Sequence, residues 1–351
     1  MDLQYFKGRR ILITGHTGFK GSWLTEMLLD AGAAVSGAAL PPPTDPSLFE
    51  TLELPERLGA HHHVTDVRNL SALEEVFKTE TPELVIHLAA QPIVRASYEE
   101  PVYTYETNVM GTVNVLECIR KAGTVKSALI ITTDKVYENL ENDRAYEEGD
   151  RLDGYDPYSN SKSCAELAVH CYKRSFLDGM GIPVSTARAG NVIGGGDFAR
   201  DRILPDCVRS AEKGEPVLVR NPFSTRPYQH VLEPLSVYLT ILKKQEEDSA
   251  FAGYYNVGPD DGDCLTTGHM ADLFCSFWGE GQTWVDGSGG NGPHEANFLK
   301  LSSRKIREIF GWRPTWNVEE AVRRTVEWAR AEDRPACTRE EIRAFLEKCV
   351  L

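Results

Sequence analysis

The chain has 351 residues, 41% of them hydrophobic, enough to bury a large core in one α/β unit or in two closely joined domains. Its formal net charge of −14 argues against nucleic-acid backbones and anionic membranes as general partners. With no apolar run of about 18 residues, no export-signal pattern and eight cysteines without CxxC spacing, we expect a cytoplasmic protein with reduced thiols.

Short β-rich runs alternate with helical patterns up to about residue 190, which is typical of βαβ units and a parallel sheet. Beyond that point the composition turns to Gly, Pro and Arg and indicates a smaller, substrate-facing part. We predict an α/β fold with a doubly wound, Rossmann-type parallel sheet and a smaller C-terminal substrate-binding domain. The expected strands are 10–14, 35–40, 63–67, 84–87, 128–132 and 184–188, and the long helices 101–121 and 158–177. The dinucleotide-binding domain is expected over 1–190 and 228–258, and the substrate domain over 191–227 and 259–351.

A glycine-rich turn follows the first strand. In ILITGHTGFKGSWL, Gly15, Gly18 and Gly21 stand between an apolar strand and an amphipathic helix. Gly15 allows the tight turn, Gly18 lets backbone N–H groups approach a pyrophosphate, and Gly21 lets the helix lie close to the sheet. The helix N-terminus adds a field that favours phosphates. This context predicts a dinucleotide site rather than an ordinary loop.

The second strand ends without the acidic residue that often bonds the ribose of a dinucleotide. Leu40 and three prolines occupy the expected place, and no Lys or Arg between Val35 and Glu56 could clamp a 2′-phosphate. NAD is therefore favoured, and NADP is not excluded. Thr44 and Ser47 are candidate sources of a ribose contact.

Residues 61 to 63 are three consecutive histidines, a residue type that often binds metal ions. Successive strand residues point to opposite faces, so the three rings are not expected to bind the same ion, and we predict no metal. The run of carboxylates over 146–156 is interpreted as a solvated loop.

The residues expected to carry the chemistry follow the fifth strand. Thr133 stands at its C-terminal edge, where open parallel sheets bind ligands. In YSNSK, Tyr158 and Lys162 are four apart on a predicted helix and share one face. A nearby ammonium favours the tyrosinate, which makes Tyr158 a candidate proton acceptor, and Lys162 can also reach ribose hydroxyls.

Several motifs occur together in one order along the chain. They are GxxGxxG, HLAA (87–90), TNVMGTVNVLE (107–117), TTDK, YxxxK and RAGNVIGGGD (188–197). Across most of its length the chain therefore resembles the extended short-chain dehydrogenase/reductase family. Within it, the chain is most similar to the CDP-glucose 4,6-dehydratase subgroup, through GHTGFKGSWL, PPTDPSLFE, TTDKVYEN, YDPYSNSK, GGGDFARDRILPD and RPYQHVLEPL. One departure is Tyr228, where Trp is expected.

The resemblance implies both a reaction and roles for named residues. The reaction oxidises C4 of a glucose, eliminates water across C5 and C6, and returns the hydride to C6. Tyr158 would be the base for the 4-hydroxyl, with Thr133 as its hydrogen-bonding partner and Lys162 as the residue that adjusts its pKa. Asp134 and Lys135 would be the acid and base of the elimination. Lys135 replaces the Glu of dTDP-glucose enzymes, and its alternative role is electrostatic support of Asp134.

The resemblance also implies the residues that bind the two ligands. A sugar nucleotide carries a diphosphate, which suits the planar guanidinium groups of the arginine-rich segment 200–226. The favoured phosphate ligand is Arg226, with Asn191 near the pyrophosphate or sugar and Tyr228 near the base. The implied cofactor contacts are Gly15, Thr17, Gly18, Phe19, Gly21, Asp66, Val67, Leu88, Ala89, Ala90, Tyr158 and Lys162. The implied substrate contacts are Asn191, Arg200, Arg202, Arg226 and Tyr228.

Other readings of the motifs remain open. A homodimer through the helices after strands four and five is implied by the resemblance, and a tetramer is an alternative. The chain could also be an epimerase or reductase of the same family, a 4,6-dehydratase of another nucleotide sugar, or a cofactor-sensing protein that has lost catalysis. We expect a small-molecule sugar nucleotide such as CDP-glucose as partner, and no nucleic acid or membrane.

Overall fold

The computed structural model describes residues 1–140, 144–288 and 299–351, and its largest element is a seven-stranded sheet whose strand pairs are all parallel. In spatial order the strands are β10 (Tyr254–Val257), β6 (Val184–Ala189), β5 (Ser127–Ile131), β4 (Leu84–His87), β1 (Arg10–Thr14), β2 (Ala34–Ala39) and β3 (His62–Val64). All six predicted strands lie in this sheet. The seventh, β10, was not predicted because it follows a long excursion of the chain. The Rossmann-type sheet is confirmed.

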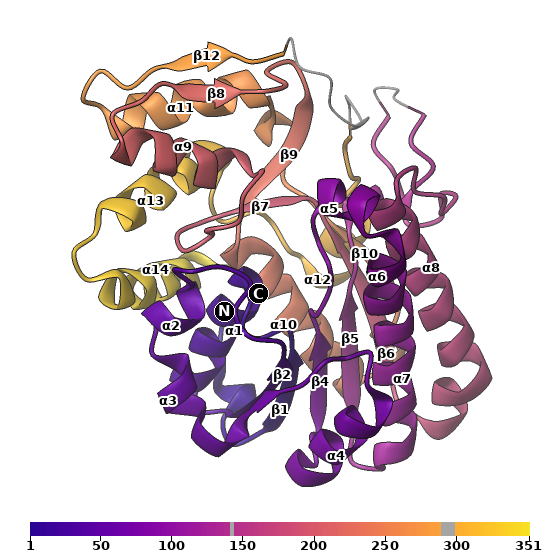
Figure 1. Ribbon diagram of the computed structural model, residues 1–351. Helices are drawn as coiled ribbons and strands as arrows, with labels where there is room; N and C mark the ends of the chain where they lie inside the picture. Colours follow the sequence, from indigo (N-terminus) through magenta and orange to yellow (C-terminus); the bar gives the residue numbers. More distant parts are fainter. Residues whose placement is uncertain (141–143, 289–298) are drawn as a thin grey trace.

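Helices cover both faces of this sheet (Figure 1). Along β1, Ile11 and Ile13 point into one core with Trp23, whereas Leu12 points into the other with Val115. This alternation is what a strand buried on both faces requires. The first face is covered by α1 (Phe19–Asp30) and α10 (Leu232–Glu247), with α14 (Arg334–Lys348) packed against α1. The second face is covered by α4 (Leu70–Glu80), α7 (Gly111–Ala122) and α8 (Pro157–Tyr172).

The two predicted long helices are present with local changes of winding. The run over 101–121 consists of α6 (Pro101–Tyr105), a π-helical turn (Glu106–Met110) and α7, and it ends at Gly123, whose φ of +67° suits glycine. The second run is α8, followed by a π-helical turn over Lys173–Leu177. Among the described residues, no helix has the length and apolar character needed to cross a membrane.

The segments that look irregular in sequence form a smaller unit above the carboxyl edge of the large sheet (Figure 1, upper left). Its strands are only three to six residues long, too short for a clear periodicity. One sheet has the order β11 (Cys264–Thr266), β9 (Thr225–His230), β7 (Asn191–Ile193), and another pairs β12 (Trp284–Asp286) with β8 (Val217–Val219). Its helices are α9 (Ile203–Glu212), α11 (Thr267–Trp278) and α13 (Val318–Arg330). Short connecting helices are α2 (Leu48–Thr51), α3 (Leu54–Leu58), α5 (Val94–Glu99) and α12 (Arg304–Phe310).

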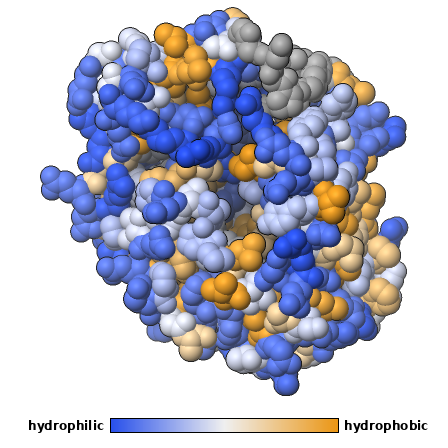
Figure 2. Space-filling model, viewed as in Figure 1, coloured by the Kyte–Doolittle hydropathy of each residue, from blue (hydrophilic) through white to orange (hydrophobic). Residues whose placement is uncertain are grey.

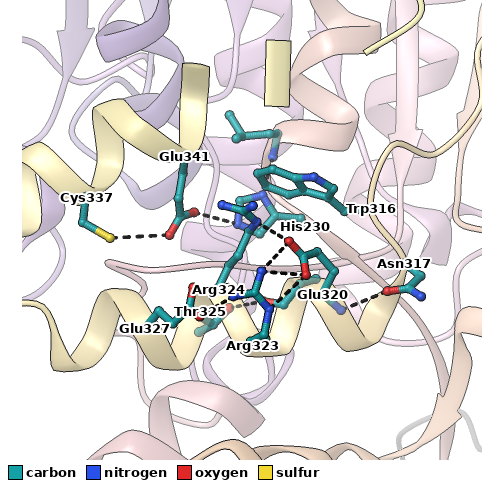
Figure 3. Close-up of polar contacts among 12 residues, drawn as sticks. His230, Trp316, Asn317, Glu320, Arg323, Arg324, Thr325, Glu327, Cys337 and Glu341 are labelled. Atoms are coloured by element: carbon teal, nitrogen blue, oxygen red, sulfur yellow. Dashed lines mark hydrogen bonds and ion pairs between the residues drawn. The ribbon is translucent and has the colours of Figure 1, made fainter. Parts of the chain in front are cut away.

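The C-terminal helices brace the point where β9 runs into α10. In Figure 3, Glu341 of α14 lies beside His230 at the end of β9, with 3.3 Å between Oε2 and Nε2, and both side chains are buried. The guanidinium of Arg324 stacks on Trp316 at 3.9 Å from the ring centre and also donates to Glu320. These contacts fix the strand that carries Arg226 and Tyr228.

Candidate active site

One cavity of about 1850 Å³ lies between the carboxyl edge of the large sheet and the smaller unit. Figure 2 shows a hollow near the centre of this face, bordered above by hydrophilic residues. Carboxyl ends of parallel strands are where open α/β sheets bind ligands. The cavity is lined by all the residues predicted for catalysis, cofactor and substrate: Gly15, Thr17, Gly18, Phe19, Gly21, Asp66, Val67, Leu88, Ala89, Ala90, Thr133, Asp134, Lys135, Tyr158, Lys162, Asn191, Arg200, Arg202, Arg226 and Tyr228.

The glycine-rich turn is too tightly packed for side chains at two of its positions. Gly15 has a φ of +78°, and a Cβ there would lie 2.6 Å from the backbone nitrogen of Ala89. A Cβ on Gly21 would lie 2.2 Å from the carbonyl oxygen of Gly15. The hydroxyl of Thr17 donates to the carbonyl of Leu40 at 2.9 Å and ties the turn to the end of β2. The resulting cradle of backbone N–H groups at the start of α1 suits a dinucleotide pyrophosphate.

The loop after β2 brings both candidate ribose contacts to the cavity wall. Ser47 is buried, and its hydroxyl accepts from the backbone N–H of Glu50 and donates to that residue's carboxylate, so it caps α2. Thr44 and Ser47 both line the cavity, and so does the exposed carboxylate of Asp45. The sequence reasoning sought an acidic residue directly after the strand and missed Asp45, which lies beyond the prolines. This loop therefore carries negative charge toward the cavity.

Two further segments complete this half of the cavity. Asp66 accepts from the Arg68 guanidinium at 2.7 Å, and hydrogen bonding from Arg68 lowers the pKa of Asp66 although burial opposes it. The amide of Asn114 on α7 donates to the carbonyl of Val67 at 2.9 Å and fixes the loop after β3. Of the consecutive histidines, His61 and His63 both contact Glu80, at 2.9 and 2.6 Å, whereas His62 contacts His16 at 2.7 Å. The alternation expected of strand residues thus sends the rings to different partners.

Tyr158 and Lys162 project from the first turns of α8, which Asp156 caps by accepting from the N–H of Ser159 at 2.9 Å. Burial raises the pKa of Tyr158 to about 12, although a hydrogen bond with the Thr133 side chain lowers it. Burial also lowers the pKa of Lys162 to about 8, and its ammonium donates to the carbonyl of Ile131 at 3.1 Å. Burial thus opposes the tyrosinate, whereas the hydrogen bond with Thr133 and the charge of Arg202 favour it.

The segment after β5 places a carboxyl group deep in the cavity wall. Asp134 is 1% exposed, and its Oδ1 accepts from the hydroxyl of Thr133 at 2.9 Å and lies 3.5 Å from the ammonium of Lys135. Within the described parts of the chain, its Oδ2 has no hydrogen-bond partner. A Cβ on Gly190 would come within 3.3 Å of this oxygen. Asp134 thus has one oxygen anchored and one buried without a partner among the described residues, while Lys135 pairs with it.

Sequence reasoning missed Lys20, which lies inside the glycine-rich turn and lines the same cavity. Burial lowers its pKa to about 7; Arg202, Lys162 and Lys135 lower it further, and Asp134 opposes them. The available signal was a cation in the first turn of a helix, where the helix dipole disfavours positive charge. Lys20 brings a further lysine side chain to the part of the cavity that holds Asp134, Lys135 and Lys162.

The smaller unit lines the other side of the cavity. Arg226 is 6% exposed and donates to the carbonyl of Thr225 at 2.9 Å. Tyr228 is buried, with its hydroxyl 3.4 Å from that of Thr267. Arg202 pairs with Asp197 at 2.9 Å, whereas Arg200 is exposed at the rim. Lining residues that sequence reasoning missed are Leu218, Asn221, Ser224 and Thr267.

Comparisons with known proteins agree with this geometry. Residues 12–259 match the family described as GDP-mannose 4,6 dehydratase. The CDP-glucose 4,6-dehydratase of Salmonella typhimurium is 44% identical over 99% of this chain and 98% of its own. The dTDP-D-glucose 4,6-dehydratase of Homo sapiens is 24% identical over 92% of this chain and 90% of its own.

Solved structures share the fold. The Thermus thermophilus UDP-glucose 4-epimerase in complex with NAD superposes with a TM-score of 0.78 at 26% identity, covering 92% of this chain and 99% of that one. The Bacillus anthracis dTDP-glucose 4,6-dehydratase in complex with NAD gives a TM-score of 0.75 at 22% identity, covering 91% of this chain and 96% of that one. By the family match and the near full-length relative, the chain belongs to the GDP-mannose 4,6-dehydratase family.

Proposed function

We propose that the protein is a CDP-glucose 4,6-dehydratase that converts CDP-D-glucose to CDP-4-dehydro-6-deoxy-D-glucose. The observation that carries this proposal is the placement of Asp134, a buried carboxyl group with one oxygen free, in the cavity wall that also holds Thr133 and Tyr158. An elimination needs such an acid beside the group that oxidises C4. The 44% identity to a CDP-glucose enzyme along the full chain supports the same reaction and the same nucleotide.

NAD is the proposed cofactor. The backbone around Gly15 and Gly21 leaves no room for side chains, as the tight turn and the close helix–sheet packing of a dinucleotide site require. The carboxylate of Asp45 and the lack of Lys or Arg between Val35 and Glu56 disfavour a 2′-phosphate. When bound, NAD supplies the acceptor for the C4 hydride and returns it to C6. Its contacts are proposed to be the cavity-lining residues named from the resemblance.

The chain's own side chains are proposed to move the protons. Tyr158, hydrogen-bonded to Thr133, accepts the proton of the 4-hydroxyl, and Lys162 binds the ribose and holds positive charge below the ring. Before the elimination the ammonium proton of Lys135 passes to Asp134, which leaves a neutral amine beside a protonated carboxyl group. The new ketone acidifies C5, whose proton passes to the amine of Lys135, while Asp134 donates its proton to the departing 6-hydroxyl, and water leaves. Lys135 returns its proton to C5 as the hydride is delivered to C6, and the proton held by Tyr158 then restores the charged Lys135–Asp134 pair.

The substrate diphosphate is proposed to lie against Arg226 and Arg202, with Asn191 at the sugar and Tyr228 at the base. Arg200, which is exposed at the rim, would meet the outer phosphate. Residues 191–227 and 259–351 would then form the substrate domain, and residues 1–190 and 228–258 the cofactor domain.

The test supplies purified enzyme and NAD with CDP-, dTDP-, UDP- and GDP-glucose and measures products by mass spectrometry. Loss of one water from CDP-glucose, with deuterium from C4 recovered at C6, is the expected result. An unchanged mass with inversion at C4 would identify an epimerase and reject the proposal. Faster loss of water from another nucleotide sugar than from CDP-glucose would reject the assignment of cytosine as the nucleotide base of the substrate.

A homodimer is proposed through the outer faces of α6 to α8, with a tetramer as the alternative. Three apolar side chains on these adjacent helices are largely exposed: Val102 by 70%, Met110 by 51% and Leu167 by 53%. Apolar surface exposed in this way favours an interface with another chain. Sedimentation of the wild type and of Leu167→Glu tests this assembly. A cytoplasmic location is also proposed, because all eight cysteines are free thiols, the state that a reducing compartment maintains.

A further inference from the structure

A fully buried ion pair lies directly behind the catalytic residues. Glu166 of α8 and Arg188 of β6 are both 0% exposed, and the guanidinium Nη2 lies 2.8 Å from the carboxylate. Replacing such a pair by apolar residues is often neutral or stabilising, so burial of the two charges is weak evidence for a role in stability. The positions of their other partners are more informative.

Glu166 accepts four hydrogen bonds from two neighbouring strands. Arg188 donates through Nε at 3.0 Å and through Nη2, Thr186 of β6 donates at 2.9 Å, and Thr132 at the end of β5 donates at 2.5 Å. Arg188 also donates to the hydroxyl of Tyr137 at 2.7 Å. One carboxylate therefore holds α8 against the carboxyl ends of β5 and β6.

Both ends of this connection reach the reacting groups. Thr132 immediately precedes Thr133 and Asp134, whose side chains are hydrogen-bonded to each other in the cavity. On α8, Glu166 lies one turn after Lys162 on the same face. Its charge raises the pKa of Lys162 against the larger, lowering effect of burial.

We propose that Glu166 is a positioning residue for the reaction. Through Thr132 it fixes the strand end that carries Thr133 and Asp134, and through its charge it keeps Lys162 protonated beneath the cofactor site. This inference rests on the proposed function only in that turnover of CDP-glucose is the readout. Failure of the wild type to turn over CDP-glucose refutes the proposed function, whereas the ratio of variant to wild type tests the inference.

The experiment compares Thr132→Val with Thr186→Val in full-length enzyme with NAD. Each removes one hydroxyl donor to the same carboxylate at nearly constant volume, so similar losses of thermal stability are expected. If Glu166 acts through the strand end, Thr132→Val lowers kcat by at least about tenfold with little change in KM, as expected for a lost bond to a charged group. The kcat of Thr186→Val is expected to stay within about threefold of the wild-type value.

Thr132→Ser, which restores the hydroxyl, is expected to recover most of the lost kcat. Equal kcat losses in the two valine variants would show a purely structural network and overturn the proposal. A Thr132→Val enzyme with wild-type kcat would also overturn it.

The electrostatic part is tested with Glu166→Gln by the pH dependence of kcat. The groups that face Lys162 are Glu166 and Tyr158 on its own helix, His87 from β4 and Lys20 from α1. His87 stays neutral over the working range because burial lowers its pKa to about 3, and Lys20 titrates in both proteins. The alkaline limb is therefore expected to move to lower pH in the variant. An unmoved limb would overturn the electrostatic role, and the two valine variants decide the positioning role even if Glu166→Gln fails to fold.

Discussion

Replacing Asp134 by Asn removes the proposed proton donor while leaving its surroundings nearly unchanged. The amide oxygen can keep the 2.9 Å hydrogen bond from Thr133, and the amide nitrogen can occupy the place of Oδ2, which lacks a hydrogen-bond partner among the described residues. The structural cost is therefore small. What is lost is proton transfer to the departing hydroxyl, which is worth a factor of about 10² to 10⁴, or about 3 to 5 kcal/mol of barrier.

The assay measures water loss by mass spectrometry and C4 oxidation by nicotinamide absorbance, with NAD affinity determined separately. We expect the variant to bind NAD normally, to oxidise C4, and to release dehydrated product at least about 100-fold more slowly. Asp153→Asn is the matched control, because Asp153 pairs with Arg151 at 2.9 Å and does not line the cavity. Dehydration by Asp134→Asn within about threefold of the wild type would refute the assignment.

Three further changes test other parts of the structure. Gly21→Ala places a Cβ about 2.2 Å from the carbonyl of Gly15, so calorimetry should find NAD affinity reduced at least about tenfold, and unchanged affinity would contradict the cradle. Arg226→Met keeps the apolar stem but removes the guanidinium, so the KM for CDP-glucose should rise about 10- to 100-fold with NAD affinity intact; an unaltered KM would place the diphosphate elsewhere. Glu233→Gln tests a buried carboxyl whose pKa burial raises from 4.5 to about 8, against hydrogen bonds from the N–H groups of Thr315 and Trp316. Because the pKa of Glu233 is higher in the folded state, the stabilising contribution of this residue to the free energy of unfolding is fully present below pH 4.5 and is lost as pH rises through about 8. Urea unfolding should show that the wild type loses stability on the order of 4 kcal/mol over this pH range and that Glu233→Gln does not. The same pH dependence of the free energy of unfolding in both proteins would refute this prediction.

The parallel sheet could be predicted because its strands are continuous apolar runs separated by helical patterns. The glycine-rich turn and the Tyr158–Lys162 spacing are local signals, and the structure brings both to the same cavity. The smaller unit was expected, but its strands were not placed, because four of the five are only three residues long and show no period.

The features that the sequence did not predict share a different cause. The capping role of Ser47 depends on a four-residue helix that follows the prolines. The burial that raises the pKa of Tyr158, and the position of Lys20 among Asp134, Lys135 and Lys162, depend on groups that the fold brings together from distant parts of the chain. The spacing of residues in the sequence shows which side chains are close on one helix or strand. It does not show which side chains from distant segments the fold brings together.

The order of the strands has a consequence for synthesis of the protein. β6 ends at Ala189, but its outer neighbour β10 begins only at Tyr254. A nascent chain that has emerged as far as the first of these residues exposes a row of unpaired backbone groups along an apolar edge, a template for aggregation. No contiguous fragment that stops before Val257 can complete the sheet, so this half of the protein closes only after strands β7 to β9 of the smaller unit have been synthesised.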